Sequence, residues 1–294
     1  MKMNAKVNNL AVLTMNSLKL NSAPLDINID FKEGSTLDHV EFPEGISLRK
    51  GVPTDELLET YKRLGISNPK EKVVAGKYPI YNQQAFATGM GADVDKLMEL
   101  TGTNANIYTV DSSYHSQEPI LLHYDLSDGD NVLDNTFIHA KEGSESTFIM
   151  YYTSGNLTTD NIEQYDGAFD ETTGEIEHAG KVVSDEGDNT MALSNDSLTT
   201  TMNGKITKNL TTDKKGFSGN QTRVYLEKNA KVHLIKVQML NKGFLFFDDI
   251  GGYSDADSSF EVTKLELGAG NVYDGLNEAQ KGYKSEFKVN YGYI

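Results

Sequence analysis

The chain has 294 residues, of which 43 are acidic and 27 basic, and its formal charge of -16 argues against nucleic acid, whose binding needs clustered lysine and arginine. The mean hydropathy of -0.46 and the lack of an apolar run near the roughly 18 residues of a spanning helix exclude a membrane protein. The sequence contains no cysteine, which excludes disulfides, thiolate metal ligands and cysteine nucleophiles.

The first 105 residues are predicted to form a small mixed α/β region. Met1–Asn9 carries two lysines, but the apolar stretch Leu10–Leu13 is too short for a signal peptide and no cleavage site follows, so we expect a cytoplasmic protein. Alternating apolar residues in Asp26–Phe31 indicate a short strand.

Two short helices are predicted next. The first begins at Pro53-Thr54, with Thr54 as N-cap, and ends at Gly65; its apolar face comprises Leu57, Leu58, Tyr61 and Leu64. The second covers about Asp93–Leu100, after the segment Gly89-Met90-Gly91.

From residue 106 to 294 the sequence is typical of strands and turns. Pro119–Tyr124 is an apolar run, Asp128–Asn131 a turn cluster, and Asn135–Ala140 a further strand. Small or polar residues then precede an alternating strand in four segments, Glu142–Tyr152, Asn229–Met239, Asp257–Leu267 and Lys284–Tyr293. The later copies start roughly 25 to 30 residues apart, which is the spacing of one coil of a β-solenoid.

An acidic, polar segment at about 155–215 interrupts these strands. Gly155–Asn189 contains ten acidic residues against the single base Lys181, and a threonine-rich tract follows to Thr212. Few of its residues are large and apolar, so it contributes little to a core and we treat it as an insertion.

The histidines are weak candidates for a metal site. His115, His123 and His139, with Asp125 or Asp134, could meet only if stacking of strands brought them together, and scattered structural histidines are the favoured interpretation. His233 alternates with Val232 and Leu234 and is expected to face outward or to pack in a polar rung position, and His39 and His178 lie in polar or acidic loops. We predict no metal ligands.

Other motifs also favour structural interpretations. Asp125–Asp130 lacks the bidentate acid of a calcium loop, and Gly89–Gly91 and Gly268–Gly270 lack the context of phosphate-binding glycines. Gly243–Phe247, followed by Asp248-Asp249, is either an exposed aromatic patch or, more in keeping with its pattern, a core strand that ends in a turn. Because no nucleophile is paired with a base, no catalytic residue and no enzyme activity are predicted.

Several segments, in order, resemble the SufB/SufD family. Leu10–Asn21 is similar to the opening of SufD-type proteins, where tryptophan usually stands in place of Met15, and Thr88–Gly91 with Asp93–Leu97 resembles the segment before their β core. The core and its later rungs are matched by Glu118–Ile120, Lys228–Leu234 with Gln238, Gly268–Leu276 and Ser285–Ile294. The resemblance implies a right-handed parallel β-helix.

The resemblance also implies a role in the SUF system, where SufD works with SufB and the ATPase SufC to assemble iron-sulfur clusters. SufB uses a late cysteine, and its lack here favours SufD. The family continues beyond a strand resembling Asn290–Ile294, with rungs and a helical tail that contact the partners, so we expect a C-terminally truncated chain. No cluster ligand is assigned.

Two other classes of function stay open. An extracellular β-solenoid that binds carbohydrate or acts as a surface protein would fit the threonine and asparagine content of residues 190–212 and the tyrosine-rich strands. A polysaccharide-active enzyme on a β-helix would need acidic side chains that converge in a groove. The sequence leaves open the oligomeric state and the role of residues 155–215.

Overall fold

The computed structural model describes the backbone of residues 2–6, 22–26, 32–33, 42–66, 72–75, 78–81, 86–116, 118–154, 162–164, 199–202, 205–208 and 216–293. Side chains are described in 42–66, 86–91, 94–95, 97–116, 118–154 and 216–293. The chain divides into two compact units: Met1–Ser154 together with Lys214–Ile294, and Gly155–Asp213.

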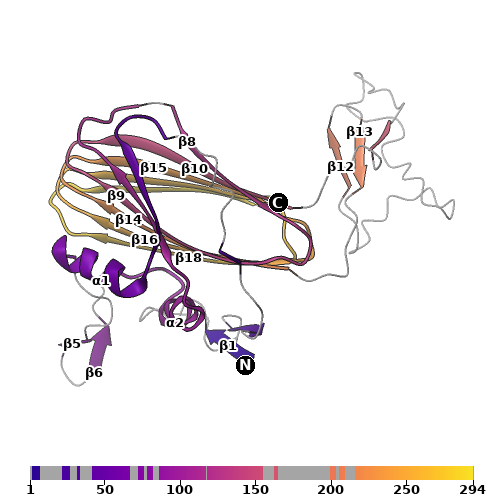
Figure 1. The fold of residues 1–294 in the computed structure, drawn as a ribbon, viewed down its shortest axis with the longest axis horizontal. Coiled ribbons are helices and arrows are strands. Elements are labelled where there is room, and N and C mark those ends of the chain that lie inside the picture. Colours follow the sequence, from indigo (N-terminus) through magenta and orange to yellow (C-terminus); the bar gives the residue numbers. More distant parts are fainter. Residues whose placement is uncertain are drawn as a thin grey trace. The chain divides into compact units, whose positions relative to one another are not determined.

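Two sheets of parallel strands form a β-solenoid in the first unit (Figure 1). Each of five coils gives one strand to each sheet, which confirms the predicted mainly β solenoid. From coil 1 to coil 5, the first sheet contains β7 (Ala105–Val110), β9 (Asn131–Ala140), β14 (Gly216–Leu226), β16 (Phe244–Ser254) and β18 (Asn271–Gln280). The second contains β8 (Ile120–Leu126), β10 (Glu145–Ser154), β15 (Lys231–Met239), β17 (Ser259–Glu266) and β19 (Glu286–Tyr293).

The remaining strands are short or lie at edges. β4 (Ile46–Val52) pairs antiparallel with β7, and β3 (Lys32–Glu33) pairs parallel with β9. Two antiparallel pairs are separate from the solenoid sheets, β1 (Lys2–Lys6) with β2 (Ser22–Asp26) and β5 (Lys72–Ala75) with β6 (Tyr78–Tyr81). Of the strand predicted at Asp26–Phe31, only Asp26 is described, and Leu10–Leu20 lies outside the described residues.

One corner in each of coils 2 to 5 explains the recurring sequence pattern. Gly143, Asn229, Asp257 and Lys284 occupy equivalent corner positions with positive φ angles of 77°, 61°, 57° and 58°. A small residue follows each of them, namely Ser144, Ala230, Ser258 and Ser285. The ladder continues through these corners, because Lys231 N donates to Ser144 O at 2.8 Å and Ser259 N to Ala230 O at 2.9 Å.

The opposite corner is where the second unit interrupts the chain. Coils 1 and 2 are joined by Ser127–Asp130, which confirms the predicted turn, with φ of 82° at Gly129. Between coils 2 and 3 this corner gives way to Gly155–Asp213. Within that unit, β13 (Lys205–Lys208) pairs antiparallel with both β11 (Ile162–Gln164) and β12 (Thr199–Met202).

Both predicted helices are present, with one difference at a cap. α1 (Thr54–Arg63) has Pro53 at its N-cap and Thr54 as its first helical residue, so the prediction that Thr54 caps the helix is wrong. α2 (Ala92–Thr101) ends at Gly102, where φ is 66°. Leu57 and Tyr61 of α1 are buried, whereas Leu58 is exposed. No helix in the described segments combines the length and apolar character needed to cross a bilayer.

Alternation along each strand divides the core in two. Inward side chains such as Phe148, Leu234 and Phe246 fill the space between the sheets. Outward side chains of the first sheet pack against α1 and α2 in two further clusters, which include Tyr61 and Val94. The solenoid therefore has a packed apolar interior, and helices α1 and α2 cover the outer face of its first sheet.

Candidate functional site: a charged column inside the solenoid

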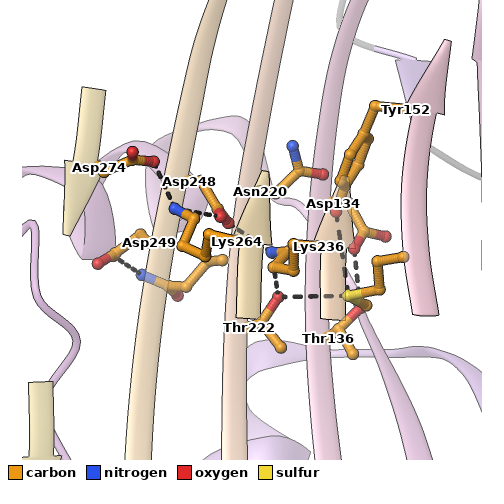
Figure 2. A network of polar contacts seen from close by, with 12 residues as sticks. Asp134, Thr136, Tyr152, Asn220, Thr222, Lys236, Asp248, Asp249, Lys264 and Asp274 are labelled. Atoms are coloured by element: carbon orange, nitrogen blue, oxygen red, sulfur yellow. Dashed lines mark hydrogen bonds and ion pairs between the residues drawn. The ribbon is translucent and has the colours of Figure 1, made fainter. Parts of the chain in front are cut away.

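A column of polar residues crosses the interior face of the first sheet. Asp134, Asn220, Asp248 and Asp274 are register partners in β9, β14, β16 and β18. All four point into the solenoid, as Figure 2 shows. Carboxylates in a protein interior are costly unless they are paired, so the facing sheet must supply partners.

The second sheet supplies two lysines. Met150, Lys236, Lys264 and Tyr291 are register partners in β10, β15, β17 and β19 and face the acidic column. The side chains of Lys236 and Lys264 are 2% and 3% exposed, and that of Asp248 is 0% exposed. Two full ammonium groups are therefore held in the core.

Asp248 lies between the two lysines and forms an ion pair with each of them. Lys236 forms an ion pair with Asp248 Oδ1 and donates to Thr222 Oγ1 at 3.0 Å. Lys264 Nζ lies 2.6 Å from Asp248 Oδ2 and 3.5 Å from Glu266 Oε1, and it also pairs with Asp274 (Figure 2). The network thus joins coils 3, 4 and 5 through charged contacts.

The pKa values follow from burial and from this pairing. Burial acts to raise the pKa of Asp248, but the ammonium groups of Lys236 and Lys264 hold it below its ordinary value. Burial, with the charge of Asp274, raises the pKa of Glu266 to about 7. For Lys264, burial acts to lower the pKa, and Asp248, Asp274 and Glu266 together raise it above its usual range. Lys264 is therefore charged at neutral pH.

The other end of the column is polar but carries no ammonium of its own. Asp134 accepts from Thr136 Oγ1 at 2.7 Å and from the Tyr124 hydroxyl at 3.3 Å. Burial raises its pKa to about 6, and the bond from Thr136 acts in the opposite direction. Among the described atoms, Asn220 Oδ1 and the Tyr108 hydroxyl are buried without a partner. Such atoms commonly hold ordered water.

Three of the carboxylates have the spacing of metal ligands. Oxygen atoms of Asp248, Glu266 and Asp274 lie within 4.8 Å of one another, and hard oxygen ligands suit magnesium or calcium. However, the ammonium group of Lys264 contacts all three. A divalent ion at the same place would face that positive charge, so Lys264 serves as the cation of the cluster.

Asp249 faces the opposite way and fastens the segment before α2 to the first sheet. Met90 N donates to Asp249 Oδ1 at 2.7 Å, and Gln221 Nε2 to Asp249 Oδ2 at 3.0 Å. Gln221 and Arg223 also bind Asp95 of α2. The predicted turn at Asp248-Asp249 is wrong, because β16 continues to Ser254, with Asp248 buried on one face of the strand and Asp249 on the other. The interpretation of Gly243–Phe247 as a core strand is supported, because Phe244, Phe246 and Phe247 are buried.

The structure does not bring the four described histidines together in one site, and His39 and His178 lie outside the described residues. His123 stacks on Tyr151 at 4.2 Å and its Nε2 lies 2.7 Å from Thr153 Oγ1, on the outer face of the second sheet. His139, in the first sheet, lies 2.7 Å from Glu227, and His115 forms an isolated bridge with Glu145. His233, half-buried, contacts Thr263 on the outer face of the second sheet, as predicted.

The glycine segments serve close packing. A Cβ on Gly89 would lie 1.8 Å from Leu276 N, and one on Gly275 would lie 2.2 Å from Met90 N. Gly268 and Gly270 lie at a coil corner, where a Cβ would come within 2.2 Å of Leu240 O and 2.3 Å of Lys242 O. These contacts are with protein backbone, so both glycine segments have a structural explanation.

Sequence reasoning missed the charged column, although it leaves a signal. In Val232–Lys236 and Phe260–Lys264, a lysine follows two inward apolar residues at the same alternating position. A lysine at an inward position in two successive coils points to acidic partners inside. A polysaccharide-active enzyme would need acidic side chains that converge in an open groove. The acidic side chains that converge in the described part of the chain, Asp248, Glu266 and Asp274, surround Lys264 in the interior instead.

Part of the chain matches a known family model. Residues 199–294, about a third of the chain, match the family model described as SUF system FeS cluster assembly, SufBD core domain. No curated protein and no solved structure matched. The matched region contains coils 3 to 5 and both lysines of the charged column. Over this third of the chain, the match agrees with the resemblance of the later rungs to the SufB/SufD family.

Proposed function

We propose that the chain is a SufD-like accessory subunit of the SUF system, which acts in the cytoplasm in a complex with a SufB-like subunit and a SufC-like ATPase. The observation that carries the proposal is the SufBD core match across β14–β19, where parallel strands of coils 3 to 5 stack without a register shift. The absence of cysteine from the 294 residues favours SufD over SufB.

The chemistry of the interior supports a role without turnover. Asp248, Lys236 and Lys264 neutralise one another, and none of the three side chains is more than 3% exposed. Catalytic acids and bases need access to a substrate, whereas paired interior charges fix how strands stack. We therefore propose that the subunit works through protein contacts, and that cluster chemistry takes place on the complex.

The test is co-expression of the whole gene product, carrying an affinity tag, with the SufB-like and SufC-like proteins of the same genome. We expect all three to co-purify, and we expect ATP hydrolysis only in preparations that contain the ATPase. Iron and sulfide content is measured on complexes with and without this chain, and we expect a lower content without it.

Two controls make the result decisive. A tagged SufB-like protein must capture the ATPase when this chain is omitted, which shows that the partners are folded. If that pair forms but neither partner associates with this chain, the SufD-like assignment is wrong. Release of sugars from polysaccharides by the purified chain would contradict the proposal that it lacks catalytic activity.

A further inference from the structure

Glu278 occupies the space that is free because Gly252, in the neighbouring coil, has no side chain. It lies on β18, faces the interior, and is the register partner of Gly252 on β16. A Cβ built on Gly252 would lie 1.6 Å from Glu278 Oε2 and 2.8 Å from Phe260 Cδ1. The carboxyl group therefore fills the gap over Gly252, beside the ring of Phe260.

Within the described part of the chain, this carboxyl group has no ionic partner, and its polar support is limited to the neighbouring hydroxyl of Ser254. The two groups do not meet in well-formed hydrogen-bond geometry, and neither has another partner. The surrounding elements β16, β17 and β19 present Gly252, Ser254, Phe260 and Phe287 at this level, none of which is ionisable. The nearest charged interior groups along the strands, Asp274 on β18 and Lys264 on β17, are bound to each other.

An ionised carboxylate is unstable in such a place, whereas a neutral carboxylic acid is tolerated. Burial raises the pKa of Glu278 to about 7, and the polar contact with the Ser254 hydroxyl acts in the opposite direction. A folded-state pKa above the ordinary value means that the seated form is stabilised at low pH and that this stabilisation is lost as the pH rises through about 7.

We propose that Glu278 is a proton-controlled latch that holds coil 5 against coil 4. When protonated, the side chain seats over Gly252 and closes the interior between β16 and β18. When ionised, it leaves this seat for water, and β18 and β19 separate more often from the coils beneath them. The latch belongs to the solenoid itself and does not depend on the role proposed above.

Hydrogen exchange measured by mass spectrometry tests the latch. Protection factors for peptides of β18 and β19, corrected for intrinsic exchange, are compared at pH 6 and pH 8. Given an ordinary pKa of 4.5 in the open state and about 7 in the seated state, we expect protection to fall about tenfold over this range. Peptides of β9 and β10 should change much less.

Three variants isolate the group responsible. In Glu278→Gln, which stays neutral, protection of β18 should be the same at both pH values. Glu286→Gln, on an exposed residue of β19, should keep the tenfold change. Gly252→Ala removes the seat, so the dependence on pH should shrink toward none.

A direct titration keeps the proposal testable if any variant folds poorly. The carboxyl carbon of Glu278, observed by NMR in glutamate-labelled protein and assigned by its loss in Glu278→Gln, should titrate with a midpoint near 7. A midpoint near 4.5, or a pH-dependent protection of β18 that persists in Glu278→Gln, would overturn the latch.

Discussion

At the scale of single residues, Lys236 has the clearest role. Its ammonium group is nearly fully buried and neutralises Asp248. In Lys236→Met, the apolar part of the side chain is kept and Asp248 loses one of its two cations. Breaking a buried ion pair costs about 3–5 kcal/mol, so the unfolding free energy should fall by about that amount in urea titrations followed by circular dichroism.

Lys231→Met is the matched control on the same strand. Lys231 pairs with Glu145, but the two side chains are 60% and 51% exposed. Exposed pairs contribute about 0–1 kcal/mol, so this variant should unfold close to the parent midpoint. Equal effects of the two substitutions would show that the interior pair does not stabilise the solenoid.

Lys284 offers a gain in stability. Its φ of 58° is in the left-handed region, which costs a residue with a Cβ roughly 1–2 kcal/mol. Lys284→Gly removes this strain, while the extra freedom of the unfolded chain offsets part of the gain, so we expect a net increase of about 0.5–1 kcal/mol. Thermal unfolding measures it.

The control is Lys228→Gly, at the corner of coil 3. Lys228 precedes Asn229 and does not have a positive φ, so glycine there relieves no strain and should lower stability slightly. A loss of stability in Lys284→Gly as large as in Lys228→Gly would contradict the strain argument.

Residue-level predictions succeeded where the cause is local. Gly65, predicted to end the first helix, follows it with a φ of 70°, and glycine is the residue that adopts this conformation at least cost. The misread pair Asp248-Asp249 depends on partners in other coils, namely Lys236, Lys264 and Gln221. The turn was predicted from two adjacent acidic residues alone, and the local sequence does not show the partners that allow these residues to be buried in a strand.

At the scale of elements, the segment before α2 is held by backbone packing. Gly275→Ala would place a Cβ 2.2 Å from Met90 N, where only backbone can move. Overpacking of this kind costs about 1–3 kcal/mol, so the variant should unfold earlier and peptides of 86–102 should exchange hydrogen faster. Gly292→Ala on β19 is the control, since its Cβ would lie 3.1 Å from the flexible tip of Leu265 and at ordinary contact distance, 4.0 Å, from Lys264 O. Normal protection of 86–102 in Gly275→Ala would contradict this role.

Elements were predictable where the pattern is repeated. The corner residues 143, 229, 257 and 284 precede strands in the same way each time, which made the solenoid recognisable. The pairing of β9 directly with β14 was not predictable, because residues 141–215 lie between these two neighbouring strands in the sequence. Strand order of this kind is set by long-range pairing.

At the scale of the whole molecule, the second unit replaces one corner. Register pairing aligns Thr153 with Met239 and Gly216 with Phe244, so Ser154 corresponds to Leu240 and three residues, Asn241-Lys242-Gly243, would fill the gap. Replacing residues 155–215 by Asn-Lys-Gly should leave strand content unchanged. The thermal midpoint should stay equal or rise, because a shorter loop costs less entropy to close.

Circular dichroism and calorimetry measure this outcome. A lower midpoint, or a loss of cooperativity, would show that residues 155–215 support the solenoid rather than interrupt it. The parent chain with its unit intact is the reference, and the pull-down described above tests separately whether the unit is needed for partner binding.

The charged column limits how this protein can evolve. Recombination between repeats can delete or duplicate one coil of a solenoid, and the equivalent corners of this chain would accept such an exchange. The interior restricts the exchange, because Asp248 of coil 4 pairs with Lys236 of coil 3 as well as with Lys264 of its own coil. Losing coil 3 would remove one of these two cations, and Lys264 would then be shared by Asp248, Asp274 and Glu266. A coil exchanged for coil 3 must therefore bring a lysine at the position of Lys236 to keep the stability of the column.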